Sequence, residues 1–392
     1  MAIFDKFRPL ARMRREMAES GIASIHVVMD RVVSATEAFI NGRPVILAGT
    51  NNYLGLTFDP DCIEAACEAV RTLGTGTTGS RVANGSYAAH EQLERDLAAF
   101  FGKRGVIVFS TGYVANLGML STLAGPGDAF VIDADCHASI YDGVRLSGAE
   151  IFRFRHNDPE DLDKRLRRLG GRAENAIVVV EGIYSMWGDR APLAEIAAVK
   201  RRHPGALLVV DEAHSLGVLG ERGRGRAEEA GVEAEVDFVI GTFSKSLGAI
   251  GGYCASDHPE LDLIRYANRP YIFTASPSPA IIASTRAALR ILASRPELRE
   301  RLWENSRRLY GRLERLGFRL GPEPSPIIAV RFAAREEAHA AWMRLMEHGV
   351  YVNLVLPPAT PDGGSLLRCS VSAGHSPEQI ERIGDAFETL AA

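Results

Sequence analysis

The sequence lacks the features that mark secreted, membrane-spanning and nucleic-acid-binding proteins. Its 392 residues include only five cysteines, an odd number without a C-x-x-C pair, which argues against a disulfide framework or a zinc site. Its longest apolar runs, such as Ala176–Val180, are far shorter than the roughly 20 residues that cross a bilayer. With 45 basic and 49 acidic side chains, the chain has no excess of positive charge for nucleic acid. We therefore expect a globular protein of the cytoplasm.

The first twenty residues are charged throughout and lack the apolar stretch typical of a signal peptide. Phe4, Phe7, Leu10 and Met13 fall on one face of a predicted basic helix. Two interpretations are open for this helix. It packs as an arm on the protein's own body, which is the expected arrangement, or it gives weak association with a membrane surface.

From about residue 100 onward, short β-branched runs alternate with helical periodicity. Strands without polar alternation, separated by helices, are typical of a parallel sheet covered on both faces, so this region predicts an α/β fold with a mostly parallel seven-stranded sheet. After about residue 285 the pattern indicates a smaller α+β domain that begins with a long helical stretch over 280–316. We expect an arm and hairpin over 1–45, a large α/β domain over 46–285 and a small C-terminal domain over 286–392. The predicted strands of the large domain are Gly105–Ser110, Ala129–Asp133, Glu150–Phe154, Ala176–Glu181, Ala206–Asp211, Asp237–Gly241 and Gly251–Ala255.

Two motifs match known binding sites in letters but not in context. Gly74–Gly79 fits G-x-G-x-x-G, yet a helical stretch precedes it where a dinucleotide site needs a strand, so we interpret it as a loop that borders a site. Asp211–His214 spells the magnesium box of ATP-driven helicases, but the sequence has no G-x-x-x-x-G-K-[ST] phosphate loop. No His, Cys and carboxylate spacing resembles a metal centre, so we expect no metal.

Polar side chains follow the ends of several predicted strands. Asp211 and Lys245 each come at or just after a buried run, and the carboxyl ends of parallel strands form sites. His137 follows another strand, and Gly112 begins a helix whose N-terminus can hold phosphate. A phosphate cradle, an imidazole, a carboxylate and a lysine together suit pyridoxal 5′-phosphate (PLP). The lysine binds the aldehyde of PLP, and the aspartate keeps its ring nitrogen protonated.

Six motifs, in chain order, resemble those of the α-oxoamine synthases, which are fold-type I PLP enzymes that share active sites across a homodimer. The resemblance extends from about residue 20 to 385 and is strongest to the bacterial serine palmitoyltransferase branch of the family. It implies that the large domain, 46–285, binds PLP. The six motifs are Asn51–Leu56, His137–Ser139, Asp211–His214, Gly241–Lys245, Arg269–Thr274 and Leu367–Arg368.

The resemblance implies a role for each matching residue. Lys245 would form the Schiff base with PLP and act as acid and base at the substrate Cα. Asp211 would pair with the ring nitrogen, and His214 would contact the ring hydroxyl. His137 would stack on the ring, with Ala213 packed against its opposite face.

Other matching residues would hold the phosphate and the substrate. Arg368 would bind the carboxylate of the amino acid as a planar fork, and Asn52 would border the same substrate. Thr274 would reach the phosphate from the partner subunit. The remaining cofactor contacts would come from Gly112, Tyr113, Thr242, Ser244 and Ser185.

The implied reaction is a decarboxylative condensation of L-serine with a long-chain acyl thioester such as acyl-CoA, which gives a 3-keto amine for sphingolipid biosynthesis. Three positions depart from the bacterial pattern: Leu356, Asn51 and Thr78 stand where arginine, tyrosine and asparagine are usual. A sibling activity therefore stays open, with glycine or alanine as the amino acid or an acyl-carrier-protein thioester as the donor, similar to 8-amino-7-oxononanoate synthase or 2-amino-3-ketobutyrate CoA ligase. A silent binding subunit is disfavoured because the predicted catalytic set is intact.

Overall fold

The structure, a computed structural model, describes residues 3–19, 26–357, 359–360 and 362–391. Its largest sheet has seven strands in the order β4-β10-β9-β8-β7-β5-β6. Strand β10 runs antiparallel to both of its neighbours, whereas the other pairs are parallel. This confirms the predicted α/β fold with a mostly parallel seven-stranded sheet. The strands are β4 Gly105–Phe109, β5 Ala129–Asp133, β6 Glu150–Phe154, β7 Ala176–Glu181, β8 Leu207–Asp211, β9 Phe238–Thr242 and β10 Gly252–Ser256.

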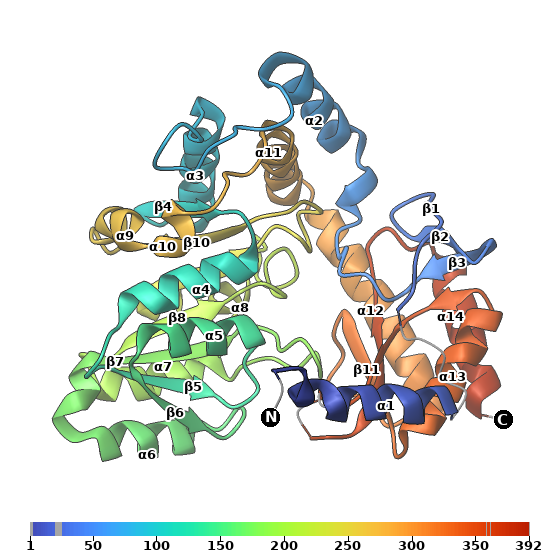
Figure 1. Ribbon diagram of the computed structural model, residues 1–392. Helices are drawn as coiled ribbons and strands as arrows, with labels where there is room; N and C mark the ends of the chain where they lie inside the picture. The colour runs from blue at the N-terminus through green and yellow to red at the C-terminus, as the bar shows by residue number, and fades with distance from the viewer. Residues whose placement is uncertain (1–2, 20–25, 358, 361, 392) are drawn as a thin grey trace.

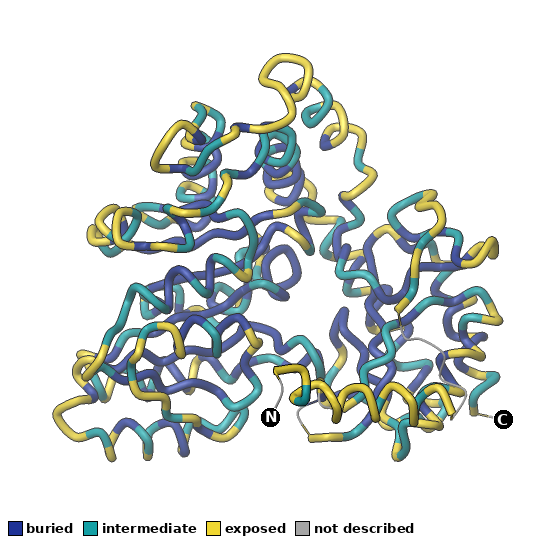
Figure 2. The backbone as a smooth tube through the Cα atoms, viewed as in Figure 1, coloured by how far each residue is buried: buried dark blue, intermediate teal, exposed yellow. Residues whose placement is uncertain are grey.

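The middle of this sheet is the core of the protein. Every residue of β5 and β7 is buried, which explains why these strands have no polar alternation. Figure 1 shows α4 and α5 lying across the front of the strands, and Figure 2 shows the strands as mostly buried. The helices of this region are α2 Pro60–Leu73, α3 Ala88–Phe101, α4 Gly112–Leu123, α5 Ala138–Ser147, α6 Pro159–Leu169, α7 Leu193–Arg202, α8 Arg226–Glu229, α9 Leu261–Ala267 and α10 Arg269–Ile272, with 3-10 turns η2 Leu56–Phe58, η3 Gly170–Asn175 and η4 Glu233–Glu235.

The C-terminal part contains a three-stranded antiparallel sheet in the order β11-β14-β13. The helical stretch predicted over 280–316 is two helices, not one. The break falls at Arg295, whose extended backbone (φ −122°, ψ 70°) follows from Pro296, since proline disfavours a helical residue before it. The elements are α11 Pro279–Ser294, α12 Pro296–Arg315, β11 Ile327–Phe332, α13 Arg335–Glu347, β12 Val350–Tyr351, β13 Asn353–Val355, β14 Ser365–Ser370 and α14 Pro377–Ala391.

The N-terminal region forms a 3-10 turn η1 (Ile3–Phe7), helix α1 (Arg8–Glu19) and strands β1 (Arg31–Val32), β2 (Glu37–Ile40) and β3 (Arg43–Leu47). Strand β3 pairs in parallel with β12, so the N-terminal hairpin shares a sheet with the C-terminal part, beside α14 in Figure 1. The three-part division at residues 45 and 285 stays a proposal, and its first boundary falls inside β3.

The expected packing of the arm on the body is not what the structure shows. No described residue of η1 or α1 is buried, as Figure 2 shows. Phe4, Phe7 and Leu10 are 76%, 50% and 52% exposed, while Met13 and Met17 are half-buried. Among the described residues, no helix is both long and apolar enough to cross a membrane.

Candidate active site

Strands β8 and β9 bring the predicted carboxylate and lysine to one edge of the sheet. Asp211 is the last residue of β8 and pairs with Ile240 of β9, and Lys245 follows shortly after the end of β9. His137 immediately precedes α5, which follows β5 on the same edge. The structure therefore brings all three predicted side chains to the carboxyl ends of parallel strands, where sites form in such sheets.

The Asp211 carboxylate is oriented by two donors. Asn116 Nδ2 donates to Oδ2 at 2.7 Å, and the backbone N–H of Ala213 donates to Oδ1 at 2.8 Å. Asn116 also donates to Ser139 Oγ at 3.0 Å, so helices α4 and α5 are joined at this point. Asp211 is buried, and its fixed carboxylate suits a cationic partner such as a protonated ring nitrogen. Asn116 was not predicted from the sequence, although it lies within the helix start that was singled out for phosphate.

Lys245 is half-buried, and burial lowers the pKa of its amine to about 8. The Arg368 guanidinium acts in the same direction, whereas the carboxyl groups of Asp211 and Glu181 act against it. Among the described residues, the amine has no hydrogen bond or ion pair. Lys245 is therefore a lysine with an accessible neutral form near physiological pH, as Schiff-base chemistry needs.

His137 lies beside a carboxyl group that the sequence analysis did not assign. The backbone N–H of His137 donates to Glu181 at the end of β7, and His137 Nδ1 lies 2.8 Å from Ser139 Oγ. Burial lowers the pKa of His137, and burial together with Asp211 raises the pKa of Glu181 well above its usual range. An imidazole with a lowered pKa and a carboxyl with a raised pKa thus border the space next to Asp211 and Lys245, which suits a flat aromatic ring.

The N-terminus of α4 forms a cradle for an anion. The Thr111 hydroxyl accepts the N–H of Val114 at 3.1 Å. The N–H groups of Gly112 and Tyr113, which precede Val114, have no partner among the described residues. A Cβ on Gly112 would lie 2.6 Å from the Thr242 Cβ, which shows why this position is glycine. Thr242 Oγ1 in turn lies 2.8 Å from the Ser244 hydroxyl. The predicted phosphate ligands are thus brought together, and free N–H groups at a helix start fit a phosphate.

Arg368 on β14 has one end of its fork free. Its Nε donates to the Ser185 carbonyl at 2.6 Å and its Nη1 to Asn51 Oδ1 at 3.0 Å, while Nη2 is buried without a partner among the described residues. A buried guanidinium nitrogen without an acceptor fits a carboxylate ligand. Asn52, the predicted neighbour of the substrate, instead donates to Thr57 Oγ1 at 2.7 Å, and its own Oδ1 has no partner within the described part of the chain.

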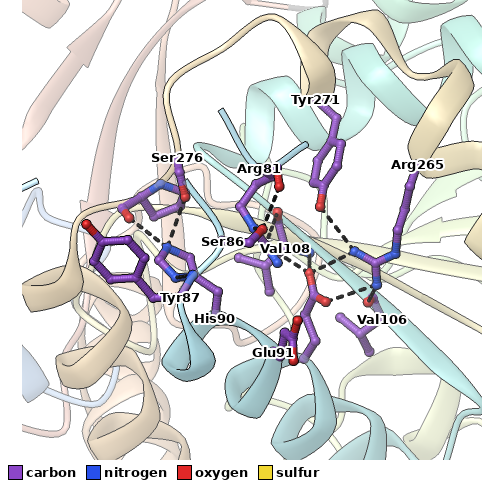
Figure 3. A network of polar contacts seen from close by, with 12 residues as sticks. Arg81, Ser86, Tyr87, His90, Glu91, Val106, Val108, Arg265, Tyr271 and Ser276 are labelled. Carbon is purple, nitrogen blue, oxygen red and sulfur yellow. Dashed lines mark hydrogen bonds and ion pairs between the residues drawn. The ribbon is translucent and has the colours of Figure 1, made fainter. Parts of the chain in front are cut away.

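A second polar network fixes the glycine-rich loop against the segment after α10 (Figure 3). Glu94 accepts from Arg81 at 3.0 Å and from Arg265 at 2.9 Å, and all three side chains are largely buried. The Ser276 N–H donates to the Gly79 carbonyl at 2.9 Å. These contacts hold in place the loop that was interpreted from the sequence as bordering a site.

The remaining predicted residues differ in burial and in hydrogen-bond partners. Ala213 lies two positions after Asp211 and is half-buried, and the Ser185 carbonyl accepts the hydrogen bond from Arg368 Nε. His214 is buried next to Tyr53, with its Nδ1 2.7 Å from the tyrosine hydroxyl. Thr274 has no hydrogen bond to the other predicted site residues within the described part of this chain, and it is half-buried.

Thr78 carries a strained backbone that its replacement should relieve. Its φ is +54°, in the left-handed region that a β-branched residue avoids and asparagine tolerates. We expect Thr78→Asn to raise the free energy of unfolding by about 1 kcal/mol, measured by thermal and urea unfolding. Thr75→Asn, on the same exposed loop but without a positive φ, should leave stability unchanged. Equal effects of the two changes would contradict the strain argument.

Comparison with known proteins places this site in a family. The aminotransferase class I and II family model matches residues 43–387, so the chain belongs to that family. It is 57% identical over 392 residues to a serine palmitoyltransferase of Caulobacter vibrioides, covering 100% of this chain and 97% of that protein. It is 50% identical over 389 residues to the serine palmitoyltransferase of Sphingomonas paucimobilis, covering 98% and 92%. A solved structure of SPT with PLP as its internal aldimine superposes with a TM-score of 0.96 at 50% identity, covering 100% of this chain and 98% of that one.

Proposed function

We propose that this chain is a PLP-dependent acyltransferase that condenses L-serine with a long-chain acyl-CoA and releases CO₂ and CoA. The observation that carries this proposal is the conjunction of Asp211, Lys245 and the free arm of Arg368 at one site, in a chain that matches serine palmitoyltransferases over its whole length. The 3-keto amine product is a precursor of sphingolipids.

The residues at the strand ends would hold PLP. Bound PLP supplies an electron sink that stabilises negative charge at the substrate Cα. Asp211 would keep a proton on the ring nitrogen, and His137 would cover one face of the ring while Ala213 covers the other. The N–H groups of Gly112 and Tyr113 would bind the phosphate, together with the hydroxyls of Thr242 and Ser244 and that of the partner subunit's Thr274. Ser185 would make a further contact with the cofactor.

The chain's own groups would guide the reaction. Arg368 Nη2 holds the serine carboxylate, and Lys245 removes the proton from the serine Cα and later returns one to it. A carbon–carbon bond forms between this Cα and the acyl carbonyl carbon, and the thiolate leaves as CoA. The bond from Cα to the carboxylate then breaks and CO₂ leaves. Asn52 would border the substrate, because it directly follows Asn51, whose side chain accepts a hydrogen bond from Arg368.

The proposal is tested with purified protein, PLP and a long-chain acyl-CoA. We expect CoA and CO₂ to appear in equal amounts with L-serine, and the 3-keto amine to be found by mass spectrometry. Glycine and alanine are run in parallel, and an acyl-carrier-protein thioester replaces acyl-CoA in a second series. Turnover with glycine or alanine but not serine would assign the sibling activity instead, and no change in visible absorbance on adding PLP would refute the whole proposal.

The lowered pKa of Lys245 predicts how the apoprotein takes up PLP. Only the neutral amine attacks an aldehyde, and with a pKa of about 8 half of it is neutral near that pH. We expect the rate of uptake, followed by visible absorbance, to rise steeply from pH 6 to 8 and to level off above about pH 9. A rate that still rises tenfold per pH unit up to pH 10 would mean that the amine titrates as an ordinary lysine.

We further propose that the working unit is a homodimer in which Thr274 acts in the partner's site. Large apolar side chains on the segment around Thr274 are strongly exposed: Leu263, Tyr266 and Phe273 are between 70% and 74% accessible. Large exposed apolar side chains on the segments just before Thr274 favour burial against a second copy. The mass of the protein in solution, from sedimentation equilibrium, tests the dimer, and a single-chain mass would contradict it.

We also propose that the enzyme acts in the cytoplasm and associates weakly with a membrane surface through η1 and α1. All five cysteines are free thiols, and the exposed Phe4, Phe7 and Leu10 lie among basic side chains. Co-sedimentation with anionic vesicles, compared with neutral ones, tests the surface association. Equal recovery of the protein in the supernatant of both would contradict it.

A further inference from the structure

Tyr53 is a fully buried residue that the proposed mechanism does not use. Its hydroxyl oxygen lies 2.7 Å from His214 Nδ1 and 3.4 Å from Asn51 Oδ1. His214 is itself buried. A contact as short as 2.7 Å between two buried polar atoms is a hydrogen bond, so one of the two groups donates its proton to the other.

Two arrangements of hydrogens compete, because the tyrosine hydroxyl has only one. In the first, Tyr53 donates to Nδ1, and the proton of His214 is on Nε2. In the second, Nδ1 carries the proton and donates to Tyr53, and Tyr53 donates to Asn51. The second places the hydroxyl hydrogen on a 3.4 Å contact, which is long for an O–H···O bond, and on an oxygen that already accepts from Arg368 Nη1 at 3.0 Å. Geometry therefore favours the first.

The charges around the pair favour the same arrangement. Burial raises the pKa of Tyr53 to about 12, so the hydroxyl keeps its hydrogen, and the nearby Arg368 cation repels that hydrogen towards the imidazole. Burial holds the pKa of His214 well below its usual range, aided by Lys245, Arg368 and His137. His214 is thus neutral and has a single N–H, and the bond at one ring nitrogen determines which nitrogen carries it.

We infer that Tyr53 is a positioning residue that fixes the tautomer of His214, so that the Nε2–H of His214 is presented as a donor to the ring hydroxyl oxygen of bound PLP. This inference rests on the proposed function. Among the described residues Nε2 has no hydrogen-bond partner, whereas Nδ1 is committed to Tyr53. A donor at the ring oxygen stabilises negative charge there, which favours the deprotonated form of the bound cofactor.

The test is the pH titration of visible absorbance in the PLP-loaded protein. Tyr53→Phe removes only the hydroxyl, and we expect the midpoint to move upward by about 0.5–1 pH unit. Tyr253→Phe is the matched control, because Tyr253 is also fully buried and its hydroxyl has no partner among the described residues. Its midpoint should equal that of the wild type. Equal midpoints for all three proteins would overturn the inference.

Two further measurements separate this role from general disturbance of the site. In a His214→Ala background, Tyr53→Phe should move the midpoint no further, because Tyr53 acts only through His214. The ¹⁵N chemical shifts of the His214 ring report directly which nitrogen carries the proton, and they give a reading even if Tyr53→Phe fails to fold. We expect the proton on Nε2, and a proton on Nδ1 would mean that Tyr53 does not donate to it, which overturns the inferred tautomer. If the wild type itself gains no colour with PLP, the proposed function fails rather than the tautomer assignment.

Discussion

Replacing Asp211 by asparagine is expected to lower kcat by roughly 10²–10³-fold or more, the cost of removing one preorganised charge from an active site. Both carboxylate oxygens already accept hydrogen bonds, from Asn116 Nδ2 at 2.7 Å and from the Ala213 N–H at 2.8 Å. The amide introduced by the substitution would have to turn its NH₂ towards one of these donors. It would also carry no negative charge, so the ring nitrogen would lose its proton and PLP its capacity to accept electrons.

The measurement is the rate of CoA release at saturating PLP, with cofactor content followed by visible absorbance. Asp133→Asn is the matched control, since Asp133 is also a buried aspartate at the end of a parallel strand of the same sheet, β5, which is separated from β8 by β7. It accepts from His156 Nδ1 at 2.9 Å, and although burial opposes the charged imidazole, carboxylates on both sides raise the pKa of His156 to about 10. The control substitution should lower the free energy of unfolding, whereas its effect on kcat should be much smaller than that of Asp211→Asn. An Asp211→Asn protein that binds PLP and keeps a tenth of its kcat would contradict the assigned role.

The sheet could be predicted from the sequence because its strands are continuous apolar runs. The predicted limits of β5, β6 and β7 match the structure residue for residue, and those of β4 and β8 differ by one residue at one end. Prediction was poorer where one residue decides the outcome. The periodicity over 280–316 continues through Pro296, but the missing N–H of proline ends α11 and restarts the chain as α12.

The candidate site residues could be located along the sequence, since strand ends and a glycine at a helix start leave local signals. Their supporting partners could not. Asn116 meets Asp211 across 95 positions of sequence, and Tyr53 meets His214 across 161. Such pairs exist only after the chain has folded, because neither residue has a local pattern that points to the other. The arm was mispredicted for a related reason: an amphipathic pattern shows that a helix has an apolar face, but not what covers it.

Arg368→Lys keeps the positive charge but should raise the KM for L-serine by about 10–100-fold. The guanidinium is held in place by the Ser185 carbonyl at Nε and Asn51 at Nη1, which leaves Nη2 for the substrate. The guanidinium makes these contacts with three nitrogens that lie in one plane. A lysine amine has a single nitrogen and cannot make all of them at once. It would either stay with the protein acceptors or turn to the substrate without a fixed direction. The KM for acyl-CoA and the PLP content should not change, because the proposed role of Arg368 involves neither.

Serine binding is measured directly by titrating the visible absorbance of the PLP-loaded protein with L-serine and with ethanolamine, which has no carboxylate. The Arg368→Lys protein should lose affinity for serine, and its affinity for ethanolamine should equal that of the wild type. Arg331→Lys on the adjacent strand β11 is the matched control, since that arginine pairs with Asp362 and covers the Trp187 ring. Equal losses for serine and ethanolamine would mean that the substitution disturbs the site as a whole, whereas a loss for serine alone assigns the carboxylate to Nη2 of Arg368.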